Sequence, residues 1–232
     1  MKKKAGVILL MAVLAAVMLI CHSAGQRLLE GVKKTSETSG RAGRMSDQLV
    51  VLDPGHGGMD CGKQGVNGIE EKEVNLKISL QIKEILKKEN IDVVLTREDD
   101  DRLADTQRAD LEERVSIMNT LKPDLAVSIH QNSYSDAGVK GAQVFYYEGS
   151  EAGEEAAGAV QEKLNQIDPK KAREVKANST YYILKNADVP VIIAECGFLS
   201  NPEEAELLAE EEYQRTVAEA VASGVVLWLN GK

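Results

Sequence analysis

The chain has 232 residues, of which 43% are hydrophobic and 28% are charged. This composition is typical of a globular protein with a buried core, and it excludes a disordered or wholly membrane-embedded chain. Eight of the 28 Lys and Arg residues but only two of the 37 Asp and Glu residues lie in the first 45 positions, so the remainder carries a net charge of −15. Because an acidic surface repels phosphate backbones, nucleic acid is not an expected partner.

The N-terminus has the pattern of an export signal. Three lysines at positions 2–4 precede an uninterrupted apolar run from Ala5 to Cys21. The run is slightly longer than a usual signal-peptide core and lies at the short limit for a membrane span. Residues 1–24 are therefore predicted to be a signal peptide or an N-terminal membrane anchor, and we favour the uncleaved anchor. The rest of the chain is expected outside the cytoplasm, membrane-anchored or secreted.

Beyond this segment, residues 25–47 are predicted to form a flexible linker, because they are rich in Gly, Ser, Thr, Lys and Arg. Residues 48–232 are predicted to form a single domain. Strands alternating with helices predict an α/β fold with an open, mostly parallel, twisted sheet of about six strands flanked by helices on both faces. Apolar periodicity predicts strands at 49–52, 91–95, 125–129, 141–147, 181–184 and 189–194, and helices at 74–86, 108–119, 151–166, 202–209 and 213–229.

Three polar residues follow predicted strands, where an open α/β sheet binds its ligands. His56 follows the first strand within the stretch DPGHGG, His130 follows the third strand, and Glu195 follows the late apolar strand. Glycines on both sides of His56 leave room for a metal. Because Glu195 ends an apolar run, its pKa should be raised, which would suit proton transfer.

The stretch GIEEKE at 68–73 adds candidate carboxylates at the start of the first helix. Spacing alone leaves open which of Glu70, Glu71 and Glu73 would act. Two histidines and one glutamate form a known catalytic zinc set that keeps a fourth position for water. A carboxylate at this place could instead only stabilise the helix dipole.

The other candidates also have structural alternatives. His56 could merely belong to a flexible turn, and His130 could be a hydrogen-bonded core residue. Glu195 could pair with an arginine, Arg97 or Arg108.

Five segments together resemble the zinc-dependent bacterial N-acetylmuramoyl-L-alanine amidases of the amidase-3 type. The segments occur in the order found in the family and cover nearly all of residues 48–230. They are VLDPGHGGMDCG at 51–62, GIEEKEVNL at 68–76, VVLTRED at 93–99, PDLAVSIHQN at 123–132 and VPVIIAECGFLSNPEEAELL at 189–208. The resemblance implies that Zn²⁺ is held by His56, Glu71 and His130, and that Glu195 is the catalytic residue. None of the four is missing, so an active enzyme is expected.

The resemblance also implies a reaction, which is hydrolysis of the amide between the lactyl group of N-acetylmuramic acid and L-alanine in peptidoglycan. The N-terminal segment, the single short domain and the stretch 98–119 look most like the sporulation amidases of spore-forming Gram-positive bacteria. Those enzymes act on spore cortex, where a separate deacetylase then makes muramic-δ-lactam. A general cell-wall-remodelling autolysin and a non-catalytic anchored peptidoglycan-binding protein are the alternatives. A lipoprotein that helps the site hold zinc is a conceivable activating partner, and the chain is expected to be a monomer.

A different enzyme hypothesis rests on Cys196, which could be a nucleophile with His130 as its base. The competing interpretation is a small buried residue that follows a strand. The sequence leaves open whether Cys61 and Cys196 form a disulfide.

Overall fold

The computed structural model describes residues 46–231; the predicted signal peptide or anchor (1–24) and all but the last two residues of the predicted linker (25–47) lie outside the described residues. Within 46–231, no helix combines the length and the apolar character that crossing a membrane requires. The strands are β1 Leu49–Pro54, β2 Asp92–Leu95, β3 Leu125–Asn132, β4 Gln143–Tyr147, β5 Lys176–Asn178 and β6 Val191–Phe198. The helices are α2 Glu71–Lys88, α3 Gln107–Leu121, α4 Glu151–Ile167, the 3-10 helix η1 Pro169–Lys171, α5 Tyr182–Asn186, α6 Pro202–Ala209 and α7 Glu211–Asn230.

All six strands form one sheet in the order β2-β1-β3-β6-β4-β5. The four strands β2, β1, β3 and β6 run parallel, whereas β4 runs antiparallel to β6 and pairs in parallel with the edge strand β5. The predicted open, mostly parallel sheet of about six strands is confirmed. Since β1, β3 and β6 are parallel neighbours, their carboxyl ends meet at one edge of the sheet.

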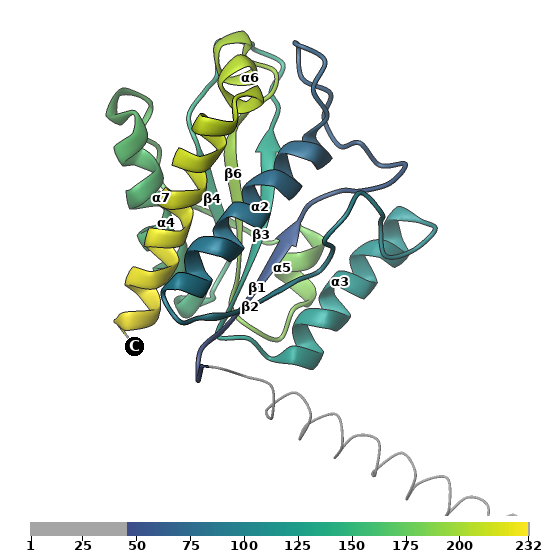
Figure 1. Cartoon of the computed structure of the whole chain (residues 1–232), viewed down its shortest axis with the longest axis vertical. Coiled ribbons are helices and arrows are strands. Elements are labelled where there is room, and N and C mark those ends of the chain that lie inside the picture. Colours follow the sequence, from purple (N-terminus) through teal and green to yellow (C-terminus); the bar gives the residue numbers. More distant parts are fainter. Residues whose placement is uncertain (1–45, 232) are drawn as a thin grey trace, which may run out of the picture. The chain divides into compact units, whose positions relative to one another are not determined.

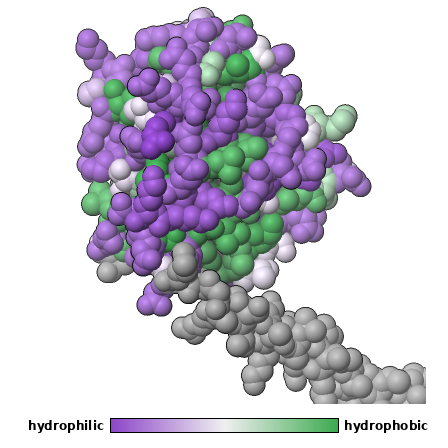
Figure 2. All heavy atoms as spheres, viewed as in Figure 1, coloured by the Kyte–Doolittle hydropathy of each residue, from purple (hydrophilic) through white to green (hydrophobic). Residues whose placement is uncertain are grey.

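Helices cover both faces of the sheet, as predicted. Successive strand residues point to opposite faces. In β1, Val50 and Leu52 join a core with α2, α4, α6 and α7, whereas Val51 joins a second core with α3 and α5. Figure 1 shows α7 lying between α4 and α2, both of which it contacts. Figure 2 shows that the outer surface on this side is mostly hydrophilic, with hydrophobic residues gathered in its central and lower part.

One prediction of local structure was wrong, and one strand was missed. The segment predicted as a strand at 181–184 is the short helix α5. Its consecutive residues Ile183 and Leu184 are both buried in the same core, which a helical turn allows and an alternating strand does not. The edge strand β5 was not predicted, because its sequence, Lys-Ala-Asn, is polar and largely exposed and has no apolar alternation.

Candidate metal and catalytic site

The turn after β1 places His56 at the carboxyl edge of the sheet. His56 has a φ of +62°, and Gly57 and Gly58 also have positive φ values. Gly55 has no room for a side chain, because a Cβ there would lie 2.2 Å from the imidazole of His130. The glycines of DPGHGG therefore let the turn reverse sharply and let the His130 ring pack against its backbone.

His56, Glu71 and His130 come together, and their candidate ligand atoms all lie within 4.8 Å of one another. Oε1 of Glu71 lies 3.2 Å from Nε2 of His56 and 3.0 Å from Nδ1 of His130. The two imidazole rings meet edge to face, with centroids 5.0 Å apart. The three residues come from the turn after β1, the start of α2 and the end region of β3, so the sheet order brings them to one point.

Among the three candidate glutamates, only Glu71 faces this cluster. Glu73 is exposed, and Glu70 pairs with Lys72. The carboxylate of Glu71 does not cap its helix. Instead, Oε2 accepts a hydrogen bond from the backbone N–H of Lys63 at 2.8 Å, and Oε1 accepts one from the backbone N–H of Gln131 at 3.0 Å. These contacts aim the carboxylate at the two histidines.

Asp60 is a site residue that the sequence reasoning missed. Its Oδ2 lies 3.0 Å from Nδ1 of His56, which leaves Nε2 of His56 facing Glu71. Metal-binding histidines commonly use their other ring nitrogen in this way. The spacing of four residues after His56, within the turn HGGMD, was the available signal.

The charges of the cluster shift its pKa values strongly. Burial by itself would lower the pKa of His56, but hydrogen bonds and charge from Glu71 and Asp60 raise it to about 9. Burial would likewise raise the pKa of Glu71, but hydrogen bonds from His130 and His56 hold it far below its usual range. The cluster thus stabilises an ionised carboxylate between two imidazoles.

Glu195 lies beside this cluster, directly opposite His130 in the pairing of β3 with β6. Both residues lie inside their strands rather than at the ends, because β3 and β6 extend further than predicted. Burial, opposed by His130 and reinforced by the charge of Glu71, raises the pKa of Glu195 to about 7. Such a carboxyl group exchanges protons readily at neutral pH.

The alternative role of Glu195 as an ion-pair partner is wrong. Its Oε2 is buried and has no hydrogen-bond partner among the described residues. Arg97 donates instead to backbone carbonyls, and Arg108 pairs with Glu112 on the surface. The raised pKa expected from sequence is present because the charges of His130 and His56 offset the effect of burial only in part.

The donor set fits a zinc ion. Two imidazole nitrogens and one carboxylate oxygen are a ligand set that zinc takes in catalytic sites. A tetrahedral zinc with bonds of about 2.0–2.1 Å separates neighbouring ligand atoms by roughly 3.3 Å, close to the two distances from Glu71. No fourth protein ligand joins the group within residues 46–231, so one coordination position would stay open.

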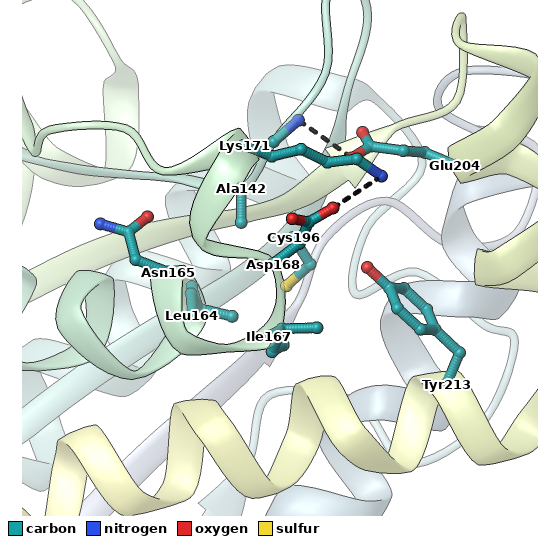
Figure 3. A pocket seen from close by; sticks show the side chains of 10 residues that line it. Ala142, Leu164, Asn165, Ile167, Asp168, Lys171, Cys196, Glu204 and Tyr213 are labelled. Carbon is teal, nitrogen blue, oxygen red and sulfur yellow. Dashed lines mark hydrogen bonds and ion pairs between the residues drawn. The ribbon is translucent and has the colours of Figure 1, made fainter.

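Cys196, the next residue after Glu195, faces the opposite side of the sheet. It is 3% exposed, belongs to the core with α4 and α7, and its thiol points to the carbonyl of Ala194. It lines a cavity of about 20 Å³ together with Ile167 and Tyr213; Figure 3 shows these side chains. Burial raises the pKa of the thiol, which therefore stays protonated. Together with its orientation away from His130, this argues against a cysteine nucleophile.

Both Cys196 and Cys61 are free thiols in the structure. No disulfide between them contributes to the fold.

The comparison with known families decides what kind of enzyme has this arrangement. Residues 50–226 match the family model described as N-acetylmuramoyl-L-alanine amidase. The chain belongs to this family. It is therefore a peptidoglycan amidase, as the resemblance in sequence predicted.

Similar proteins of known name are amidases as well. The chain is 33% identical over 196 residues to the germination-specific N-acetylmuramoyl-L-alanine amidase of Bacillus subtilis, covering 81% of this chain and 82% of the relative. It is 30% identical to the N-acetylmuramoyl-L-alanine amidase AmiA of Escherichia coli, covering 79% of this chain and 76% of that one.

Solved structures share the fold. The CwlD amidase from Clostridioides difficile, determined in complex with the GerS lipoprotein, matches with a TM-score of 0.77 and 34% identity, covering 80% of this chain and all of that one. The amidase AmiC2 of Nostoc punctiforme matches with a TM-score of 0.71 and 34% identity, covering 80% of this chain and 98% of that one.

Proposed function

We propose that this amidase is zinc-dependent, that His56, Glu71 and His130 hold the ion, and that Glu195 is the catalytic residue. The observation that carries the proposal is the convergence of two imidazoles and one carboxylate within 4.8 Å. The raised pKa of Glu195, next to His130, supports a role in proton transfer.

A bound zinc ion would supply a Lewis acid that polarises the substrate carbonyl and makes a water molecule more acidic. The residues of the chain carry out the rest. Ionised Glu195 accepts a proton from the attacking water as its oxygen bonds to the lactyl carbonyl carbon. The protonated carboxyl group then gives this proton to the amine of L-alanine as the C–N bond breaks. The products are a lactyl carboxylate and a peptide with a free amino terminus. A pKa of about 7 suits both directions of transfer.

We further propose that the substrate is spore cortex peptidoglycan, in which the product is converted to muramic-δ-lactam by a separate deacetylase. The likeness to the germination-specific amidase and to CwlD supports this assignment over a general autolysin. In keeping with the complex of CwlD with a lipoprotein, we propose an activating lipoprotein partner. The apolar run near the N-terminus supports an extracytoplasmic location, with that run as signal or anchor.

The test uses the purified full chain, zinc and two sacculus preparations, one from spore cortex and one from vegetative walls. Mass spectrometry should find free stem peptides and lactyl carboxylates from cortex, and a chelator should abolish both until zinc is restored. Adding a muramic acid deacetylase should then produce the lactam. Equal release from both preparations would favour a general autolysin. Release that survives complete removal of metal would contradict zinc dependence.

A purified chain that releases nothing should be tested again with the lipoprotein partner. Inactivity in its presence, with zinc bound, would favour a peptidoglycan-binding protein over an enzyme.

A further inference from the structure

Two buried arginines donate hydrogen bonds to the turn that carries His56. Neither arginine belongs to the proposed metal site. Arg114 of α3 is 1% exposed and Arg97, which follows β2, is 4% exposed. Buried arginines are uncommon, because removing a charge from water is costly unless it is paired and fully hydrogen-bonded. Their contacts therefore indicate what they do.

Arg114 donates three short hydrogen bonds into the end of β1 and the turn after it. Its Nη2 donates to the carbonyl of His56 at 2.7 Å, and its Nη1 donates to the carbonyl of Pro54 at 2.8 Å and to Oδ1 of Asp53 at 2.7 Å. Its Nε donates to Oδ2 of Asp110 at 2.6 Å, one helical turn earlier in α3. The guanidinium is thus fixed by two carboxylates while it holds the backbone of a proposed metal ligand.

Arg97 donates further hydrogen bonds to the same turn and also to the start of α2. Its Nε donates to the carbonyl of Pro54 at 3.0 Å, and its Nη2 donates to the carbonyls of Gly55 at 3.0 Å and Lys72 at 2.8 Å. Lys72 is the residue after Glu71. All three carbonyls from Pro54 to His56 therefore accept hydrogen bonds from the two guanidinium groups, and one guanidinium links the turn to the helix start that carries Glu71.

The backbone conformation of His56 explains why these hydrogen bonds matter. A residue with a side chain rarely adopts a left-handed φ such as the +62° of His56. This backbone conformation persists only where the surrounding structure determines it. Arg114 contacts the carbonyl of His56 and not its ring, so its hydrogen bond acts on the imidazole through the backbone.

We infer that Arg114, fixed by Asp53 and Asp110, is a positioning residue that holds the left-handed turn at His56 and so sets the geometry of the metal site, with Arg97 linking this turn to Glu71. The inference rests on the proposed metal site. Loss of such supporting contacts costs about 10–100-fold in metal affinity. A lysine in place of Arg114 keeps the positive charge between the two aspartates but lacks the planar fork that reaches His56.

The experiment measures Zn²⁺ affinity by competition with a chromophoric chelator, and the visible spectrum of the Co²⁺-loaded protein, on the full chain. Arg114→Lys should bind zinc about 10–100-fold more weakly than the unchanged chain and should alter the Co²⁺ spectrum. Arg108→Lys is the matched control, because Arg108 lies on the same helix but pairs only at the surface with Glu112; it should change neither. Val221→Ala is the stability control. Val221 of α7 is fully buried in the core on the face of the sheet opposite to α3, so the change should lower the melting temperature and leave zinc affinity unchanged.

Measuring zinc binding by the unchanged chain tells failure of the proposed metal site from failure of the positioning role. If it fails to bind zinc tightly, the proposed metal site is wrong, and the inference fails with it. If it binds zinc and folded Arg114→Lys binds within about two-fold of it, only the positioning role is overturned. Should Arg114→Lys not fold, Asp110→Asn decides, because it weakens the anchor of Nε while keeping Arg114. Its zinc affinity should fall by more than about two-fold, and an unchanged value would overturn the inference.

Discussion

Glu195 and Cys196 are neighbours on β6, yet they face two different environments. Glu195 lies beside a cluster of histidines and a carboxylate, whereas Cys196 faces apolar side chains of α4 and α7. Burial raises the pKa of both groups. The carboxyl group reaches a value of about 7 and stays able to exchange protons, while the thiol becomes inert. The alternation of side chains along β6 therefore places one residue at the proposed site and the next in the hydrophobic core.

The comparison predicts the largest loss when the reactive edge loses a proposed metal ligand. His130→Ala removes one of the three proposed protein ligands, so zinc affinity should fall by more than the roughly 100-fold that supporting contacts can cost, and peptide release should become undetectable. Chelator competition and a muropeptide assay measure the two effects. A variant that still binds one zinc ion tightly would remove His130 from the site.

A change at Glu195 should separate metal binding from turnover. Glu195→Gln keeps the size of the side chain but cannot accept the proton, so kcat/KM should fall by about 10²–10⁴-fold while bound zinc stays at one ion per chain. Metal analysis of the same sample is the control. Unimpaired hydrolysis by this variant would refute the catalytic role.

The pH profile should carry the signature of the same group. A carboxylate acts as a base only when ionised, and burial raises the pKa of Glu195 to about 7. Activity should therefore fall as pH decreases through this value, by about ten-fold per unit well below it. Because a bound cation favours the ionised form, the midpoint in the zinc enzyme should lie at or below pH 7. A kcat/KM that stays level down to pH 4 would contradict the assignment.

The smallest effect on activity is expected on the core side of β6. Cys196→Ala should lower the free energy of unfolding by about 1 kcal/mol through lost packing and leave kcat/KM unchanged. Urea unfolding and the muropeptide assay measure the two quantities. Alkylation of the native protein should likewise spare activity, whereas a chelator should abolish it. Loss of turnover with retained zinc in Cys196→Ala would revive the cysteine hypothesis.

Much of this arrangement could be predicted from the sequence, because the informative residues lie at or near the carboxyl ends of strands. Buried runs ending near His56 and His130, together with the order of the five segments, indicated both the fold and the edge at which side chains meet. The choice of Glu71 over Glu70 and Glu73 came only from the resemblance to a family. Helical spacing could not supply it, because the direction of the Glu71 carboxylate depends on N–H groups of Lys63 and Gln131.

The parts that could not be predicted depend on contacts between distant segments. Arg97 was considered only as an ion-pair partner of Glu195, yet it binds backbone carbonyls of the turn after β1. Such contacts have no periodicity in sequence, since any carbonyl can accept them. The same reason applies to α5, where tertiary packing outweighed the strand preference of its Tyr and Ile residues.

The order of the strands also determines how much of the chain is needed to form the site. Its components lie after the first strand, at the first helix, on the third strand and on the last strand of the chain, so residues from His56 to Glu195 must all be in place. A fragment that ends before β6 lacks both Glu195, the proposed general base, and the central strand that joins the two halves of the sheet. A protease that cuts anywhere between these points, and lets the pieces separate, therefore leaves no fragment that contains the whole site.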